Sequence, residues 1–148
     1  MRKLTIGDIH GGLKSLVQAL ERAKYDYLND KLIFLGDYVV GWSESSELVE
    51  YLINLDEKAV YKSVFLLGNH DKWCKDWLES GNIAKIWEMQ GGRATIDSYI
   101  KTGYVAKDSH RKFFKECKTY YIDEDNNGFC HGGFTSRKGL GHDPYESN

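Results

Sequence analysis

Several apolar segments of this chain end at residues that can bind a metal ion. Three of them end in a glycine followed by a polar residue, as Gly7-Asp8, Gly36-Asp37 and Gly68-Asn69. His10 follows Asp8 by two residues, so in an extended segment both side chains project to the same side. A fourth apolar segment leads into His131, which is followed by Gly132-Gly133. Carboxylate, carboxamide and imidazole groups together suit divalent cations such as Mn, Fe(II), Zn, Co or Ni.

Each of these residues also has a common structural explanation. An aspartate between a strand and a helix is often an N-cap, and a Gly-Asn pair is often part of a turn. A buried histidine is often a core residue with satisfied hydrogen bonds. The repetition of the pattern, in order and at the ends of successive apolar segments, favours a metal site. No cysteine occupies these positions, which argues against a structural zinc site with thiolate ligands.

The elements that must position these residues follow from the apolar patterns. Residues 3–7, 31–35 and 63–67 are predicted strands. Residues 13–24 have helical spacing, and Ser43 is predicted to open a second helix whose apolar face includes Leu48 and Leu52. Alternating strands and helices predict an α/β fold with a parallel sheet and right-handed crossovers. Ligands bind at the carboxyl ends of such strands, so Asp8, Asp37 and Asn69 should meet there.

The rest of the chain is expected to continue with helices at 71–79, 92–102 and 108–117. Two late strands are expected at 120–122 and 129–130, the second leading into His131. The acidic run at 123–128 lacks the spacing of an EF-hand calcium loop, so we interpret it as a solvated hairpin turn.

Composition limits the classes of protein. The chain has 148 residues, of which 41% are hydrophobic and 28% charged, as in a single globular domain. The net charge of −2 gives no electrostatic footprint for nucleic acid or for an anionic membrane. No apolar run has the length of a transmembrane helix or the form of a signal peptide. Three cysteines without CxxC spacing predict a reducing compartment, so we expect a cytoplasmic protein.

At this point the motifs resemble those of a known family. Gly7-Asp8-Ile9-His10-Gly11, Gly36-Asp37-Tyr38-Val39, Gly68-Asn69-His70-Asp71 and His131-Gly132-Gly133 resemble the successive blocks of calcineurin-like metallophosphoesterases. The resemblance is closest to the branch of protein serine/threonine phosphatases and symmetrical dinucleoside-tetraphosphatases. It implies a sandwich of two sheets with helices outside, of which this chain would supply the N-terminal portion, mainly the first sheet.

The resemblance also implies a ligand set and an activity. Asp8, His10 and Asp37 would hold a first divalent metal ion, and Asp37 would bridge to a second ion bound by Asn69 and His131. Manganese is the expected metal, with Fe, Zn, Ni or Co as alternatives. A hydroxide held by the two ions would hydrolyse a phosphomonoester or phosphoanhydride, with His70 as general acid. Asn69 would also contact the substrate, which would be a phosphorylated small molecule or a phosphoprotein.

The chain departs from the family pattern in its second and last blocks. Val40 and Gly41 stand where the family usually has an aspartate, which orients the histidine corresponding to His70, and an arginine, which binds phosphate. Lys72 and Arg93 are candidate replacements for that arginine. The family also has a late metal-binding histidine, and His142 follows His131 too closely to fill this position readily. We therefore expect His142 to belong to a tail.

The aromatic and cysteine side chains near these blocks allow two interpretations. Trp42 could form a pocket wall. Trp73 and Trp77 are four residues apart, which favours a core-facing helical stripe over a substrate pocket, and Trp87 could belong to either. Cys74 and Cys130 are expected to pack as small apolar side chains.

Two further functions remain open from the sequence. With Val40, Gly41 and no secure late histidine, the chain could be a degenerate scaffold that binds metal and phosphate without turnover. A nucleic-acid end-processing phosphoesterase is the other alternative, and the acidic charge balance argues against it. Residues 1–148 are expected to form one domain that is truncated at its C-terminus. An incompletely covered sheet then predicts self-association.

Overall fold

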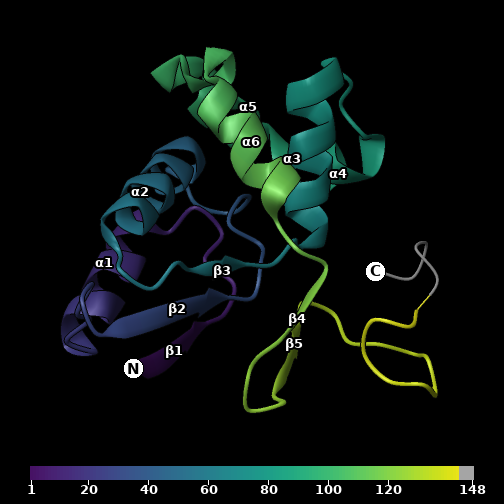
Figure 1. Ribbon diagram of the computed structural model, residues 1–148. Coiled ribbons are helices and arrows are strands. Elements are labelled where there is room, and N and C mark those ends of the chain that lie inside the picture. Colours follow the sequence, from purple (N-terminus) through teal and green to yellow (C-terminus); the bar gives the residue numbers. More distant parts are fainter. Residues whose placement is uncertain (144–148) are drawn as a thin grey trace.

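A three-stranded parallel sheet forms the centre of the computed structural model, which describes residues 1–143 (Figure 1). Its strands lie in the order β1 (Arg2–Ile6), β2 (Asp30–Phe34) and β3 (Val64–Phe65). Helix α1 (Leu13–Arg22) connects β1 to β2, and helix α2 (Ser45–Lys58) connects β2 to β3. The predicted alternation of strands and helices is thereby confirmed. The second helix begins at Ser45 and not at Ser43, because residues 42–44 still belong to the preceding bend.

The alternation of side chains along β2 gives the sheet two buried faces. On one face, Leu32 and Phe34 pack in a cluster that includes Leu16 of α1 and Leu48 of α2. On the other face, Ile33 packs with Val64 and Leu66, and no helix takes part in that cluster.

That second face is covered by a hairpin formed from β4 (Tyr120–Ile122) and β5 (Gly128–Cys130). Tyr121 and Phe129 pack against the cluster around Ile33. Lys118, just before β4, exchanges backbone hydrogen bonds with Phe65 and Leu67 at the edge of β3. A two-stranded antiparallel sheet therefore lies against the parallel sheet, which agrees with the start of the predicted sandwich.

Lys3 of β1 forms ion pairs with the turn of this hairpin. Its ammonium lies 2.7 Å from carboxylate oxygens of Asp123 and Asp125 and 3.0 Å from Glu124. Asp123 also accepts the backbone N–H groups of Asp125 and Asn127, and these hydrogen bonds within the turn stabilise its conformation. The predicted hairpin turn is confirmed, and its acidic groups hold a lysine of the same chain.

Four α-helices form a lobe above the sheet in Figure 1: α3 (Asn69–Ser80), α4 (Lys85–Met89), α5 (Gly92–Thr102) and α6 (Asp108–Glu116). A short 3-10 turn, η1 (Tyr104–Ala106), joins α5 to α6. Trp77, Trp87 and Tyr99 are buried and pack together in this lobe. The buried position of Trp77 confirms the predicted core stripe at that residue. Helix α4 was not predicted, because five residues are too few for a helical period to show.

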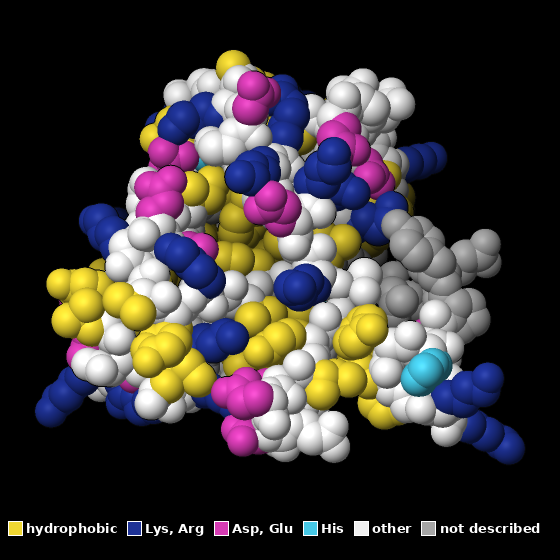
Figure 2. Space-filling model, viewed as in Figure 1, with side chains coloured by type: hydrophobic (Ala, Val, Ile, Leu, Met, Phe, Trp, Pro, Cys, Tyr) yellow, Lys and Arg dark blue, Asp and Glu magenta, His cyan; other side chains and the backbone are white. Residues whose placement is uncertain are grey.

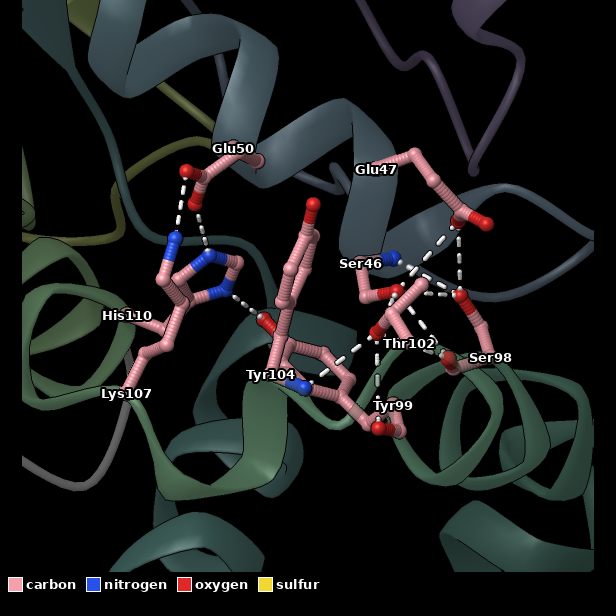
Figure 3. A network of polar contacts seen from close by, with 9 residues as sticks. All are labelled: Ser46, Glu47, Glu50, Ser98, Tyr99, Thr102, Tyr104, Lys107 and His110. Atoms are coloured by element: carbon pink, nitrogen blue, oxygen red, sulfur yellow. Dashed lines mark hydrogen bonds and ion pairs between the residues drawn. The ribbon is translucent and has the colours of Figure 1, made fainter.

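A polar network joins the lobe to α2 (Figure 3). Glu50 of α2 accepts from Lys107 at 2.5 Å and contacts Nε2 of His110 at 2.7 Å, while Nδ1 of that histidine bonds the Tyr99 hydroxyl. One turn earlier on α2, the Ser46 hydroxyl contacts the Ser98 hydroxyl of α5 at 2.8 Å. These buried bonds fix α2 against α5 and α6.

No helix among residues 1–143 is long and apolar enough to cross a membrane. Cys74, Cys117 and Cys130 are free, and Cys74 is buried in the core as predicted.

Candidate metal centre

Sharp backbone turns follow the carboxyl ends of β1 and β2 and bring the loops together. His10, Asp37 and Val40 all have positive φ, at 49°, 55° and 74°. Gly68, which precedes Asn69, lies so close to this loop that an added Cβ would be 2.0 Å from Oδ1 of Asp37. Glycine at this position is therefore required by the approach of two loops, as the repeated Gly-ligand pattern suggested.

Asp8, His10 and Asp37 form a compact cluster of ligand atoms. One ligand atom from each lies within 4.8 Å of the others. Nε2 of His10 lies 3.6 Å from Oδ2 of Asp8 and 3.7 Å from Oδ2 of Asp37. The structure thus brings together the three residues expected to hold the first ion.

His131 reaches the same carboxylate from the end of β5. Its Nε2 lies 3.3 Å from Oδ2 of Asp37, and its Nδ1 lies 4.0 Å from Oδ1 of Asp8. Oδ2 of Asp37 therefore has two imidazole nitrogens within 4 Å, Nε2 of His10 at 3.7 Å and Nε2 of His131 at 3.3 Å.

Backbone carbonyls fix the orientation of both histidines. Nδ1 of His10 is 3.0 Å from the carbonyl of Val39, and Nδ1 of His131 is 2.9 Å from the carbonyl of Leu35. Because a carbonyl only accepts, each Nδ1 carries the proton and Nε2 is left to face the carboxylates. Metal-binding histidines are commonly oriented in this way.

Asp71 holds the loop that carries Asp37. It is completely buried and accepts the backbone N–H groups of Asp37, Tyr38 and Gly68 at 2.6, 2.9 and 2.9 Å. Burial raises the pKa of its carboxyl to about 7. The three N–H donors favour the charged form and therefore oppose this rise, but burial has the larger effect. Sequence reasoning quoted this residue within the third block but gave it no role. Its position three residues after Gly68, typical of a capping residue, was the available signal.

The charges of the cluster shift its pKa values strongly. The hydrogen bond to Asp37 raises the pKa of His131 to about 9, although burial opposes this. Burial disfavours the charged form of Asp37, but His131 and His70 outweigh it and lower the pKa of that carboxyl. A negative carboxylate thus stands at the centre of the site and is compensated by imidazole protons, which a metal ion would replace.

His70 lies beside the cluster, but no backbone carbonyl among residues 1–143 orients its ring as in His10 and His131. Its backbone N–H donates to Oδ1 of Asp37 at 3.2 Å, and its ring lies edge-on to His10 at 5.7 Å between centroids. Its Nδ1 is buried and has no hydrogen-bond partner among residues 1–143. Burial lowers the pKa of this imidazole. Val40, at the position of the family's aspartate, offers no acceptor side chain.

Asn69 and Lys72 line a cavity of ≈ 530 Å³ that reaches His131. Asn69 is the first residue of α3, and Lys72 also forms an i,i+4 ion pair with Asp76 at 2.9 Å. Arg93 lies on α5, pairs with Asp97 at 3.2 Å and does not line this cavity. The structure therefore places Lys72 beside the centre and gives Arg93 another partner.

Trp73 is half-buried and packs against the main core cluster, as the predicted stripe requires. It also lines the same cavity and lies edge-on to His70 at 5.3 Å. Trp87 is completely buried in the core. The side chain of Trp42 is 69% exposed and lines none of the three described cavities. His142 is exposed in the segment after β5, as expected for a tail.

The donor set fits divalent cations. Two carboxylates and two imidazoles converge within hydrogen-bonding or ion-pair distance, and the histidines present deprotonated Nε2 atoms once the carboxylates bind an ion. Asn69 lines the cavity that reaches His131.

Comparisons with known proteins agree with this geometry. The chain is 38% identical over 66 residues to a symmetrical bis(5'-nucleosyl)-tetraphosphatase of Actinobacillus succinogenes, covering 45% of this chain and 22% of that protein. It is 39% identical over 71 residues to the enzyme of the same name from Marinomonas sp., covering 48% and 24%. The matched segments thus span about a quarter of the length of these relatives.

Two solved structures share the fold. One, provisionally described as a diadenosine tetraphosphatase, superposes with a TM-score of 0.70 at 19% identity, over 98% of this chain and 56% of that one. The other, a metallophosphoesterase from Sphaerobacter thermophilus, gives a TM-score of 0.54 at 28% identity, over 83% and 43%. The sequence model of the calcineurin-like phosphoesterases matches residues 1–145. The chain therefore belongs to the calcineurin-like phosphoesterase family.

Proposed function

We propose that the chain hydrolyses phosphate esters, either phosphomonoesters or phosphoanhydrides, with two divalent metal ions. The observation that carries this proposal is the position of Asp37, whose Oδ2 lies 3.7 Å from Nε2 of His10 and 3.3 Å from Nε2 of His131. Asp8 and His10 would complete the first site, and Asn69 and His131 the second. Manganese is the proposed metal because oxygen donors, which suit it, make up three of the five proposed ligands: Asp8, Asp37 and Asn69.

Bound ions would lower the pKa of a water molecule, so that it loses a proton and can attack phosphorus as hydroxide. They would also offset negative charge on the phosphoryl oxygens. The residues of the chain orient the reactants. Asn69 would donate its amide to a phosphoryl oxygen, and Lys72 would supply a positive charge from the adjacent turn of α3. His70, beside Asp37, would donate a proton to the leaving oxygen. Arg93 would reach the substrate only after leaving Asp97.

The first experiment measures metal content and activity together. The protein is dialysed against Mn(II) and analysed for metal, and hydrolysis of p-nitrophenyl phosphate is followed. Two ions per chain and Mn-dependent turnover are expected. Asp37→Asn should lose both the second ion and turnover, whereas Asp108→Asn, a change at a fully exposed residue of α6, should keep both. One ion or none, without turnover, would remove the proposal.

A scaffold that binds metal and phosphate without turnover is the second candidate. It is favoured by the buried Nδ1 of His70, which lacks the acceptor that the family's aspartate would supply. Full metal content with no hydrolysis in the same experiment would support it. Nucleic-acid processing receives less support, because basic and acidic side chains are interspersed over the face in Figure 2 and form no basic stripe there.

Four further expectations stay proposals. We propose that residues 1–148 act as one domain and that copies associate through the free edge of β1, which has a strand neighbour on one side only among residues 1–143. Light scattering at micromolar concentration tests this. We also propose the cytoplasm as the compartment, since three free thiols suit a reducing environment. The substrate would be a phosphorylated small molecule or a phosphoprotein.

A further inference from the structure

The cavity beside the metal centre has an apolar, aromatic wall that phosphate chemistry does not require. The polar side chains of its lining include Asn69, Lys72 and His131, of which His131 belongs to the metal centre. Leu67, Trp73 and Phe134 contribute the large apolar side chains. The volume of ≈ 530 Å³ lies within the range of pockets that enclose an organic ligand.

The two aromatic residues come from different elements. Trp73 lies on α3 and reaches the general-acid candidate, because its ring is edge-on to His70 at 5.3 Å. Phe134 follows Gly132-Gly133 in the segment after β5 and keeps 53% of its surface exposed. Together with Trp73, it gives one cavity two aromatic side chains from segments that are far apart in the sequence.

We propose that this cavity binds a planar aromatic ring of the substrate, with the phosphate of the same molecule at the metal centre. The inference rests on the proposed function and names the substrate class for that site. Aromatic rings attract one another through offset or edge-to-face contacts, beyond the contribution of the area they bury. A saturated ring of similar size fills the same volume but lacks these contacts. Lys72, on the cavity wall between Asn69 and Trp73 in sequence, supplies charge for the phosphate.

The test separates ring recognition from hydrolysis. Binding of 2-phenylethylphosphonate and 2-cyclohexylethylphosphonate to the Mn-loaded protein is measured by calorimetry. Neither compound can be hydrolysed by attack at phosphorus with loss of an alkoxide, so affinity is independent of turnover. The aromatic compound is expected to bind about threefold to tenfold more tightly, as one or two aromatic contacts provide.

A matched pair of variants assigns the preference to the cavity. Phe134→Ala should lower the preference for the aromatic compound about threefold. Tyr27→Ala is the control, since Tyr27 is 52% exposed, almost the same as Phe134, and belongs to the loop before β2, away from the cavity. The control should keep the wild-type preference. Because both side chains are half exposed, neither change is expected to unfold the protein.

The outcomes distinguish the two proposals. Equal affinity for the two phosphonates, no binding of either, or equal effects of Phe134→Ala and Tyr27→Ala would overturn ring binding. A Phe134-dependent preference in a protein that hydrolyses no phosphate ester would support the cavity and remove the proposed hydrolysis. Hydrolysis of phosphate esters without a preference for the aromatic compound would support the proposed hydrolysis and overturn ring binding by the cavity.

Discussion

Position 40 offers the most direct test of how much catalytic machinery is missing. Val40 is a buried β-branched residue with φ of 74°, a region that L-residues with branched side chains strongly disfavour. Its backbone N–H is held by the buried hydroxyl of Thr95 at 3.0 Å. The next residue, Gly41, packs against His10, whose ring contacts that of His70. Cγ1 of Val40 lies beside Gly91, 3.3 Å from the position of an added Cβ there. The reason to test position 40 is the family resemblance, in which an aspartate at this position orients the histidine that corresponds to His70.

Val40→Asp would supply the acceptor that Nδ1 of His70 lacks. Satisfying a buried polar atom recovers about 1–3 kcal/mol, and aspartate tolerates positive φ better than valine by about 1 kcal/mol. Burial of the new carboxylate opposes both gains, so the change in stability should be small. Catalysis should respond more strongly, since an orienting partner of this kind contributes about 10–100-fold. The same carboxylate would raise the pKa of His70, which burial now lowers.

Leaving-group dependence is the assay that isolates this effect. Benzyl phosphate needs protonation of its leaving oxygen, whereas p-nitrophenyl phosphate hardly does. Val40→Asp should raise kcat/KM about tenfold or more for benzyl phosphate and much less for p-nitrophenyl phosphate. Val40→Leu is the control, because the leucine side chain has nearly the shape of aspartate and offers no acceptor. Equal rates for the two variants, or equal gains on the two substrates, would refute a missing partner of His70 as the cause.

Three other perturbations follow from buried polar groups. Asp71→Ala should lower the free energy of unfolding in urea by about 3 kcal/mol, because three buried N–H groups lose their acceptor, while Asp76→Ala on the exposed side of the same helix should cost about 0.5 kcal/mol or less. Burial lowers the pKa of His110, so its contribution to stability is present above the unfolded value near 6.5 and is lost as pH falls; urea midpoints should drop more from pH 7 to pH 5 in wild type than in His110→Gln. Lys3→Met should speed amide exchange in the turn after β4, since its three carboxylate contacts disappear, and unchanged exchange would show that the turn holds itself.

The sequence predicted the parallel sheet and the proximity of Asp8, His10 and Asp37 because both depend on local patterns. Each strand is a short apolar run, and each of Asp8, Asp37 and Asn69 follows such a run directly. The hairpin and His131 followed from the same kind of pattern late in the chain. These features need no knowledge of which distant residues touch.

What could not be predicted depends on contacts between distant segments. Nothing local shows that Asp71 would accept N–H groups from residues more than thirty positions away, or that Thr95 would hold Val40 in a left-handed conformation. Trp73 and Trp77 share a helical spacing, yet only Trp77 is buried in the core, because the cavity opens on the Trp73 side. Its positive charge makes Arg93 a candidate to bind phosphate, but the charge does not show that Arg93 pairs with Asp97 four residues later on the same helix.

The position of His131 on β5 also affects the order in which the site is assembled during synthesis. Asp8, His10 and Asp37 all leave the ribosome early, and 94 residues separate Asp37 from His131. At roughly 5–20 residues per second, about 5–20 s pass before the last imidazole is made. During that time a growing chain offers two carboxylates and one imidazole, a set that binds copper and zinc more tightly than manganese. The synthesis of His131, whose Nδ1 contacts the carbonyl of Leu35, is therefore the step that completes the cluster of carboxylates and imidazoles.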